Sequence, residues 1–171
     1  STASLVRQAR SSSTFSTDID YIKMRVAGTL RAQLDATDAD AMARLARRAG
    51  MRYLVITTKH HDGFALWPSK HGDFNVSRAG DSRDIMRAVA DACRRHDVVP
   101  CWYHSIMDWH HPDWGTRRAW NDKASGTPDM DRYVDYMKRQ LKELVTGYGP
   151  LGILWFDGEW ENPWTHERGV D

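Results

Sequence analysis

The chain has 171 residues, of which 41% are hydrophobic and 27% charged, a composition typical of one soluble globular domain with its own core. Its 24 Lys and Arg residues against 23 Asp and Glu leave a formal net charge of +1. The electrostatic field of the whole chain would therefore not attract nucleic acid or an anionic membrane. The small net charge is more consistent with a neutral or small polar ligand.

The two cysteines, Cys93 and Cys101, do not indicate a disulfide framework. We expect both to be buried thiols that pack as small hydrophobic groups. No apolar run reaches the roughly 18 to 20 residues of a membrane span. No signal-peptide core is visible either, so the compartment stays unknown.

The N-terminal part of the chain shows little regular patterning. Residues 1–17 are rich in Ser, Thr and Arg and contain no acidic residue, which predicts a mobile tail. A strand is expected around residues 21–26. We therefore predict a poorly defined segment over residues 1–34 and one catalytic-type domain over residues 35–171.

The first clear helix precedes the first clear strand. From Met42 to Ala49 apolar residues recur at i, i+3, i+4 and i+7, which predicts an amphipathic helix over residues 38–49. Thr37 is the expected N-cap and Gly50 the expected terminator. The β-branched run that follows is of the kind buried on both faces of a parallel sheet.

This helix-then-strand order occurs three times. The predicted pairs are a helix over 38–49 with a strand over 53–57, a helix over 85–92 with a strand over 98–103, and a helix over 133–145 with a strand over 151–156. Pro100 lies inside the second strand and weakens that prediction.

Alternating helices and parallel strands indicate an α/β fold, either a doubly wound sheet or a barrel of eight βα units. No Gly-rich phosphate loop supports the doubly wound sheet. Polar and aromatic residues follow each strand, where a barrel keeps its active site. Because a full barrel takes about 250 residues, the predicted fold class is a partial (β/α)8 TIM-type barrel.

The end of the third strand presents a carboxylate. Side chains alternate along a strand, so Trp155 and Asp157 share one face, with Asp157 at the carboxyl end. An Asp before a Gly is also typical of a turn or a helix N-cap, and spacing alone does not separate that role from catalysis. The neighbouring indole favours a sugar site.

The loops after the first two strands are rich in histidine. His60 and His61 can donate to and accept from sugar hydroxyls as neutral imidazoles. An internally hydrogen-bonded pair and a metal site remain alternatives. Since no His-x-His or helical His-x-x-x-His spacing occurs, we predict no metal and no other cofactor.

Aromatic residues crowd the second half of the chain. Seven of the eight tryptophans lie from Trp102 onward, several of them in polar loop segments. Aromatic rings in such loops pack against the C–H faces of sugars, while nearby polar groups bind the hydroxyls. The clustering favours a carbohydrate ligand.

Three motifs together resemble the α-L-fucosidases of glycoside hydrolase family 29. They are Lys-His-His-Asp-Gly-Phe at residues 59–64, Tyr-His-Ser-Ile-Met-Asp-Trp-His-His at residues 103–111, and Leu-Trp-Phe-Asp-Gly at residues 154–158. Their order and spacing are similar to those of the family over about residues 35–160.

The resemblance implies a retaining α-L-fucosidase that hydrolyses terminal α-L-fucosyl linkages of glycans. Asp157 would be the nucleophile, and His60, His61, Tyr103 and Trp155 would contact the fucose. The partner would be a fucosylated oligosaccharide or glycoconjugate. A homo-oligomer or a complementing chain is left open, as is the compartment, which in the family is often secreted, periplasmic or lysosomal.

The sequence also departs from the family pattern. The His-Trp-Gly-type strand and the Glu-Trp pair of the family are absent, and the family's acid/base Glu normally lies in a loop beyond the Asp-Gly element. Glu159, Glu161 and Glu167 follow Asp157 too closely to match it. A non-catalytic carbohydrate-binding fragment and a metal-dependent hydrolase that uses the His-rich loops are therefore kept as alternatives.

Overall fold

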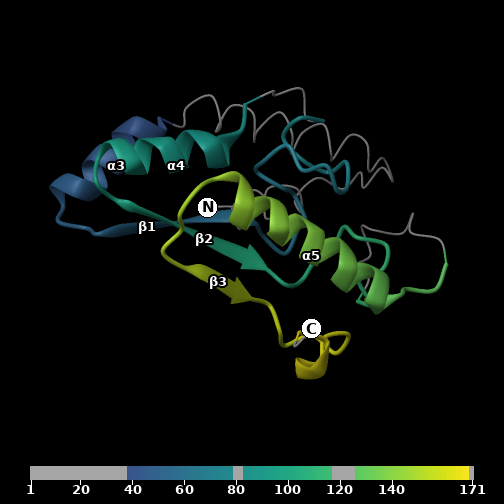
Figure 1. The fold of residues 1–171 in the computed structure, drawn as a ribbon. Coiled ribbons are helices and arrows are strands. Elements are labelled where there is room, and N and C mark those ends of the chain that lie inside the picture. Colours follow the sequence, from purple (N-terminus) through teal and green to yellow (C-terminus); the bar gives the residue numbers. More distant parts are fainter. Residues whose placement is uncertain (1–37, 79–82, 117–125, 170–171) are drawn as a thin grey trace, which may run out of the picture. The chain divides into compact units, whose positions relative to one another are not determined.

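The computed structural model describes residues 38–78, 83–116 and 126–169 (Figure 1). The chain divides into two units, residues 1–35 and 36–171, and the description below concerns the second. The predicted tail and the predicted strand around residues 21–26 lie outside the described residues. No described helix is long and apolar enough to cross a membrane.

The described part of the chain is α/β. Its elements in chain order are α3 (Ala39–Arg48), β1 (Tyr53–Lys59), α4 (Ile85–Arg95), β2 (Val99–Ser105), α5 (Met130–Gly147), β3 (Leu154–Asp157) and the 3₁₀ helix η1 (His166–Gly169). All three predicted helix-strand pairs are confirmed. The strands form a parallel sheet in the order β1-β2-β3, so they end at the same edge.

Each of the three described α-helices has an aspartate as its N-cap. The side chain of Asp38 accepts from the backbone N–H of Ala41 at 2.9 Å, so the N-cap of α3 is Asp38 and the prediction of Thr37 was wrong. Asp84 and Asp129 cap α4 and α5 in the same way. A carboxylate there satisfies N–H groups that have no partner within the helix and opposes the positive end of its dipole.

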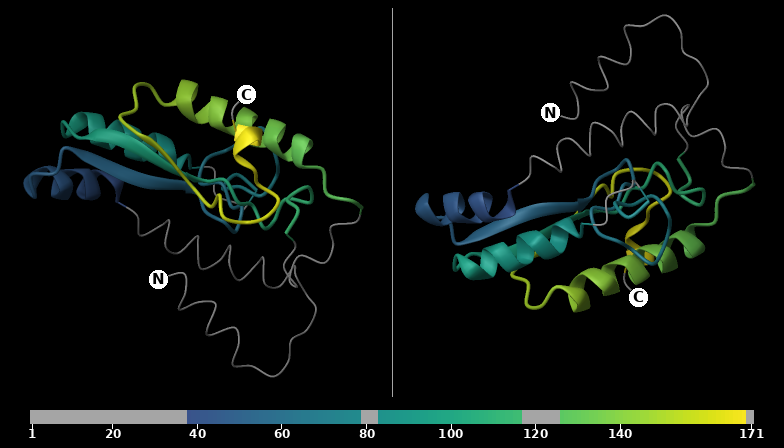
Figure 2. Two further views of the ribbon diagram at one scale, coloured as in Figure 1. Left: turned by 90° about the horizontal axis from the view of Figure 1, so that it is seen from below. Right: turned by 90° about the horizontal axis from the view of Figure 1, so that it is seen from above.

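The helices lie in one layer against the sheet. Figure 1 shows α3 and α4 on the same side of the strands, and Figure 2 shows α5 alongside α4. Two arginines of α4 bind the C-terminal end of α5: Arg87 donates to the carbonyl oxygen of Gly147, and Arg94 donates to that of Tyr148. The carboxyl ends of β2 and β3 lie side by side through the strand pairing itself, in which Ser105 is opposite Asp157.

Pro100 lies inside β2 without breaking the sheet. Residues 100 and 102 of β2 direct their backbone groups toward the β3 side, as Gly152 N donates to Pro100 O and Trp102 N to Ile153 O. Pairing with β3 starts only at Trp102, opposite Leu154. The missing N–H of proline therefore falls before the ladder begins and removes no strand bond.

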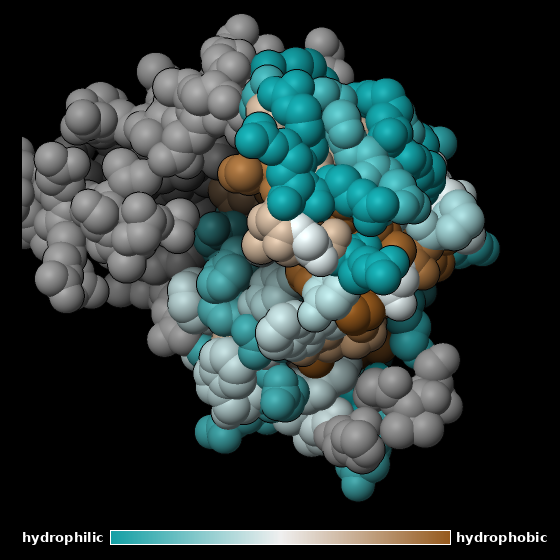
Figure 3. Space-filling view, turned by 90° about the vertical axis from the view of Figure 1, so that its left-hand side faces the viewer, coloured by the Kyte–Doolittle hydropathy of each residue, from teal (hydrophilic) through white to brown (hydrophobic). Residues whose placement is uncertain are grey.

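The described sheet is open, and its strands are less buried than predicted. Most of β1 is half-buried, and only Thr58 and Lys59 are buried. Several large hydrophobic side chains at the beginnings of the strands are exposed, among them Tyr53, Val99 and Ile153. Figure 3, which faces the end of the molecule from which the strands start, shows hydrophobic surface between hydrophilic residues.

A cluster of hydrophobic side chains, which we call the loop core, lies beneath the loop that follows β2. Its buried members are Ile106, Met107, Trp114, Tyr133 and Met137. The hydroxyl of Tyr133 on α5 donates to the backbone oxygen of Ile106 in the loop. The loop is thus packed on a helix, which gives the side chains near the end of β2 fixed positions. The two cysteines are buried and unpaired, as predicted.

Candidate active site

Five side chains meet at the carboxyl ends of the three strands, and we call them the strand-end cluster. They are His60, His61, Tyr103, Trp155 and Asp157. The rings of the two histidines lie 4.1 Å apart between centroids, that of His60 stacks on Tyr103 at 5.7 Å, and that of Tyr103 meets Trp155 at 6.2 Å. Every site residue expected from the sequence therefore lies in one continuous set of contacts.

The carboxylate of Asp157 is held by two donors. The hydroxyl of Tyr103 donates to Oδ2 at 2.7 Å, and the backbone N–H of Gly158 donates to Oδ1 at 2.9 Å. Gly158 has a φ of +92°, so the chain turns there in a conformation that other residues rarely adopt. Each carboxylate oxygen keeps a second lone pair for another partner.

Tyr103 stays protonated in this arrangement. Burial and the hydrogen bond to Asp157 both raise the pKa of its phenol above the ordinary value. The hydroxyl is therefore a lasting donor at neutral pH, and it orients the carboxylate from the neighbouring strand.

His61 has an assignable tautomer. The hydroxyl of Ser105 donates to the backbone oxygen of Met107 at 2.8 Å, so toward Nδ1 of His61, 2.6 Å away, it acts as acceptor. Nδ1 then carries the proton, and Nε2 is left as an acceptor. Burial and the neighbouring His60 lower the pKa of the imidazole, which favours this neutral form.

A buried ion pair joins the last residue of β1 to the loop after β2. Nζ of Lys59 lies 2.9 Å from Oδ2 of Asp108, and both side chains are almost completely buried. Oδ1 of Asp108 accepts from the backbone N–H groups of His110 and His111. Burial alone raises the pKa of Asp108, but the Lys59 ammonium outweighs it and holds that pKa below its usual range.

The histidines of the loops do not gather around a common point. His104 points to the helix side, where Nδ1 lies 2.8 Å from the hydroxyl of Thr58, while His110 stacks on Phe74 and His111 contacts Tyr136. Within the described residues no group of three His, Cys, Asp or Glu side chains is arranged to hold a metal ion.

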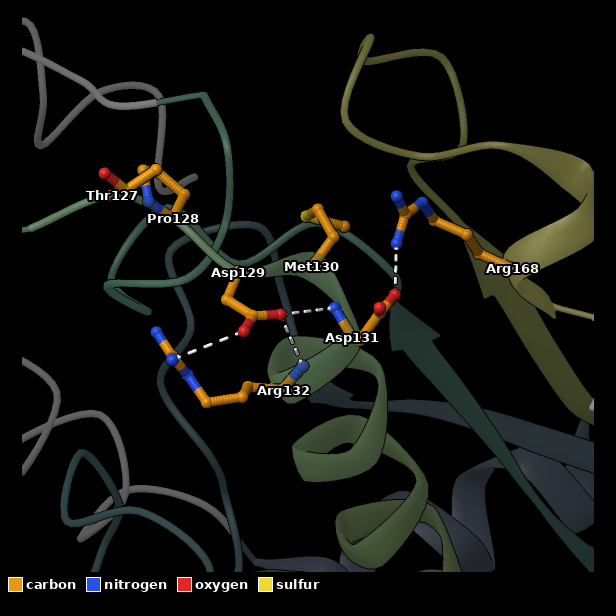
Figure 4. Close-up of a pocket in the computed structure, with 7 residues that line it drawn as sticks. All are labelled: Thr127, Pro128, Asp129, Met130, Asp131, Arg132 and Arg168. Atoms are coloured by element: carbon orange, nitrogen blue, oxygen red, sulfur yellow. Dashed lines mark hydrogen bonds and ion pairs between the residues drawn. The ribbon is translucent and has the colours of Figure 1, made fainter.

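A hollow of about 400 Å³, shown in Figure 4, lies elsewhere, around the first turn of α5. Its charged walls pair with one another, Arg168 with Asp131 and Arg132 with Asp129. We assign no ligand to it. Within the strand-end cluster, His60 and Trp155 are exposed and His61 is buried.

Comparison with known proteins decides the family. Residues 5–170 match the family model described as alpha-L-fucosidase. The chain belongs to the α-L-fucosidase family. Its match to the tissue alpha-L-fucosidase of Homo sapiens is 35% identical over 125 residues, and its match to that of Bos taurus is 34% identical over 133 residues.

Solved α-L-fucosidases share the fold of the described part. Alpha-L-fucosidase isoenzyme 1 from Paenibacillus thiaminolyticus is 45% identical with a TM-score of 0.65, over 73% of this chain and 31% of that one. A GH29 α-L-fucosidase from Bacteroides thetaiotaomicron is 35% identical with a TM-score of 0.63, over 74% and 28%. The match to the human relative includes 72% of this chain but only 26% of the human protein. The chain therefore spans about a quarter of the length of such relatives.

Ser105 was not singled out from the sequence, and Glu161 was considered there only as an acid/base. Ser105, which sets the tautomer of His61, is two residues beyond Tyr103 and shares its face of β2, so strand alternation was the available signal. Glu161 accepts hydrogen bonds from two indoles, a role that no short-range pattern indicates.

Proposed function

We propose that the chain carries the nucleophile and part of the sugar-binding site of a retaining α-L-fucosidase, which hydrolyses terminal α-L-fucosyl linkages of glycans. The observation that carries the proposal is the hydrogen bond from Tyr103 to Asp157. It joins two residues of separate motifs, 54 positions apart, at the edge where parallel α/β folds bind ligands.

The proposed reaction takes two steps. Asp157 attacks the anomeric carbon of fucose as the glycosidic bond breaks, which forms a covalent fucosyl-enzyme, and water then hydrolyses this ester. A related structure from Bacteroides thetaiotaomicron, 35% identical, is described as a trapped covalent intermediate with 2-fluoro-fucosyl fluoride. The hydroxyl of Tyr103 orients the carboxylate of Asp157 for the attack in the first step.

The remaining members of the strand-end cluster are proposed to bind the sugar. The ring of Trp155, 57% exposed, offers an apolar surface for the methyl group and C–H face of a deoxysugar. Nε2 of His61 is an acceptor for a sugar hydroxyl, and His60 lies exposed beside it. Relatives described with α-L-fucose or an iminocyclitol inhibitor support a ligand of this class.

We further infer that the three-stranded sheet is part of a larger (β/α)8 barrel. Its outer strands β1 and β3 have no further neighbour among the described strands, and the solved relatives are about three times as long as the matched region. The acid/base carboxyl group would lie beyond the described residues, in a further part of the barrel or in a complementing chain. The division into residues 1–34 and 35–171 stays a prediction.

A non-catalytic carbohydrate-binding role is the second candidate, because no described residue is assigned as acid/base. Calorimetric titration with fucose separates the two candidates. Binding at millimolar fucose without turnover of any fucoside would favour the binding role.

The nucleophile is tested with a substrate that needs no protonation. An aryl α-L-fucoside with an acidic phenol as leaving group reports on Asp157 even where the acid/base is missing. Replacing Asp157 with Gly should lower turnover at least about 1,000-fold. Sodium azide, which fits the space left by the carboxylate, should restore turnover and yield the fucosyl azide of inverted configuration.

Labelling supplies the direct readout. Incubation with 2-fluoro-fucosyl fluoride should add one fluorofucosyl mass to the peptide that contains Asp157. Asp97→Asn is a matched control, since the side chain of Asp97 is 85% exposed, distant in the fold, and should change neither turnover nor labelling. A label on another carboxylate, or undiminished turnover in Asp157→Gly, would make the assignment wrong.

A further inference from the structure

Glu161 bridges two tryptophans in the loop that follows the proposed nucleophile. Trp114 donates its indole N–H to Oε2 at 2.8 Å, and Trp109 donates to Oε1 at 3.4 Å. The backbone oxygen of Glu161 accepts from Trp164 at 3.0 Å, which closes a turn. Both carboxylate oxygens and the backbone are therefore engaged within the same loops.

The bridge is anchored in a rigid part of the fold. Trp114 is fully buried in the loop core, and its ring lies 5.0 Å from that of Tyr133 of α5 between centroids. Glu161 lies only four residues beyond Asp157. Its carboxylate thus ties the loop after β3, which has no helix of its own at this point, to the loop after β2, which packs on α5.

The tied loops form two walls around His61. The ring of Trp109 lies 5.5 Å from the imidazole on one loop, and the ring of Trp160 lies 5.5 Å away in an edge-on contact on the other. The backbone N–H of Trp109 also donates to the backbone oxygen of His61 at 2.8 Å. These contacts leave the imidazole only 9% exposed.

We propose that Glu161 is a positioning residue that fixes the walls of His61 and so keeps its imidazole buried, in one orientation, with Nε2 as acceptor. Its side chain acts through Trp109 and through the backbone beside Trp160. Because it follows Asp157 by only four residues, it is not proposed as the acid/base. The catalytic consequence rests on the proposed function, whereas the effect on His61 does not.

Nuclear magnetic resonance of the histidine ring nitrogens gives a direct test in the chain itself. The unmodified chain should show His61 as the Nδ1–H tautomer, with a pKa below 6.5 because burial is the largest influence on it. His60, Asp62, Asp157 and Glu161 are the titratable groups that act on it. In Glu161→Ala the walls separate, the imidazole gains water, and the pKa should move up toward 6.5.

The direction of that shift separates two roles of Glu161. The negative charge of Glu161 itself raises the pKa of His61 as a minor influence. A role by charge alone would therefore lower the pKa in Glu161→Ala, and a role in global stability alone would leave the pKa and tautomer of the folded chain unchanged. Either outcome would overturn the proposal.

Glu143 is a matched control. Its carboxylate accepts from the indole N–H of Trp67 at 2.9 Å and from the hydroxyl of Ser69 at 2.8 Å, on the helix side of the fold. Glu143→Ala removes an indole–carboxylate bond of the same kind without touching His61, whose signals should stay in place. Where Glu161→Ala does not fold, Trp114→Phe removes one donor, keeps a ring, and should move the His61 signals in the same direction.

The effect of Glu161 on turnover is measured separately from its effect on His61. With an activated aryl α-L-fucoside, in the chain and in any longer natural form that includes it, Glu161→Ala should lower kcat/KM about 10- to 100-fold, as small misplacements of site groups do. Glu143→Ala should stay within about twofold. Absence of turnover in the unmodified protein would count against the proposed function, while an unmoved His61 would count against this inference.

Discussion

The buried ion pair between Lys59 and Asp108 should carry a large share of the stability of the site-bearing loops. Asp108→Asn keeps the shape of the side chain and an oxygen for the two backbone donors, but it removes the negative charge. The ammonium of Lys59 would then be left fully buried with only neutral partners, such as Gln140 Oε1 at 3.2 Å. Breaking such a pair from one side costs about 3 to 5 kcal/mol.

Urea unfolding followed by circular dichroism measures this cost. With a slope of about 2 kcal/mol per molar urea, the midpoint should fall by roughly 1.5 to 2.5 M while the slope stays unchanged. The double variant Lys59→Met with Asp108→Asn should be more stable than Asp108→Asn alone, because it no longer buries an unpaired charge.

An exposed pair provides the comparison. The side chains of Arg139 and Asp135, one turn apart on α5, are 58% and 60% exposed, and Asp135→Asn should cost no more than about 0.5 kcal/mol. A loss below about 1 kcal/mol for Asp108→Asn, or strictly additive effects in the double variant, would refute the reasoning from burial.

Three further outcomes follow from single positions. Gly63→Ala should destabilise the chain more than Gly50→Ala in urea unfolding: both glycines have φ near +80°, but a Cβ at Gly63 would stand 2.2 Å from a carboxylate oxygen of Asp108 and one at Gly50 meets nothing. The free energy of unfolding should fall as the pH drops from 7.5 to 5.5, because burial holds the pKa of His104 well below 6.5 and the unfolded chain therefore takes up a proton first. This histidine contributes a slope of up to about 1.4 kcal/mol per pH unit to the free energy of unfolding, and His104→Gln should flatten that slope. Tyr103→Phe should lower kcat for an activated aryl α-L-fucoside by about 10-fold or more with little change in stability, since it removes one donor to the nucleophile.

A specific result would contradict each of these three predictions. Equal losses at the two glycines would remove the clash from the explanation. A stability profile flat between pH 7.5 and 5.5 would mean that no buried neutral histidine is linked to folding. Unchanged kcat in the tyrosine variant would show that the carboxylate is oriented by other groups.

Much of the local structure was predictable. The apolar stripe from Met42 to Ala49 and the β-branched run over residues 53–57 carry the periods of a helix and a buried strand, and both elements are present. The cap of α3 was misplaced by one residue because Thr37 and Asp38 are both good N-caps. Which of two neighbouring residues becomes the N-cap depends on the residue at which the backbone first turns helical, and a short sequence pattern does not specify that residue.

The acceptance of Pro100 within β2 was not predictable from the strand itself. It depends on which side of β2 the backbone groups of residue 100 face, and on β3 starting its pairing two residues later. Both are properties of neighbouring strands, and no local pattern encodes them.

The α/β order, the three motifs and the residue types of the strand-end cluster could be predicted from the amino-acid sequence, because strand periodicity and chain order are local properties. Three contacts became visible in the folded chain alone: the hydroxyl of Tyr103 reaches Asp157, Ser105 sets the tautomer of His61, and Glu161 joins two indoles. These contacts link residues up to 54 positions apart, and their geometry follows from the register of parallel strands and the packing of a loop on α5. Sequence periodicity selects which side chains face one way, whereas packing selects which of them touch.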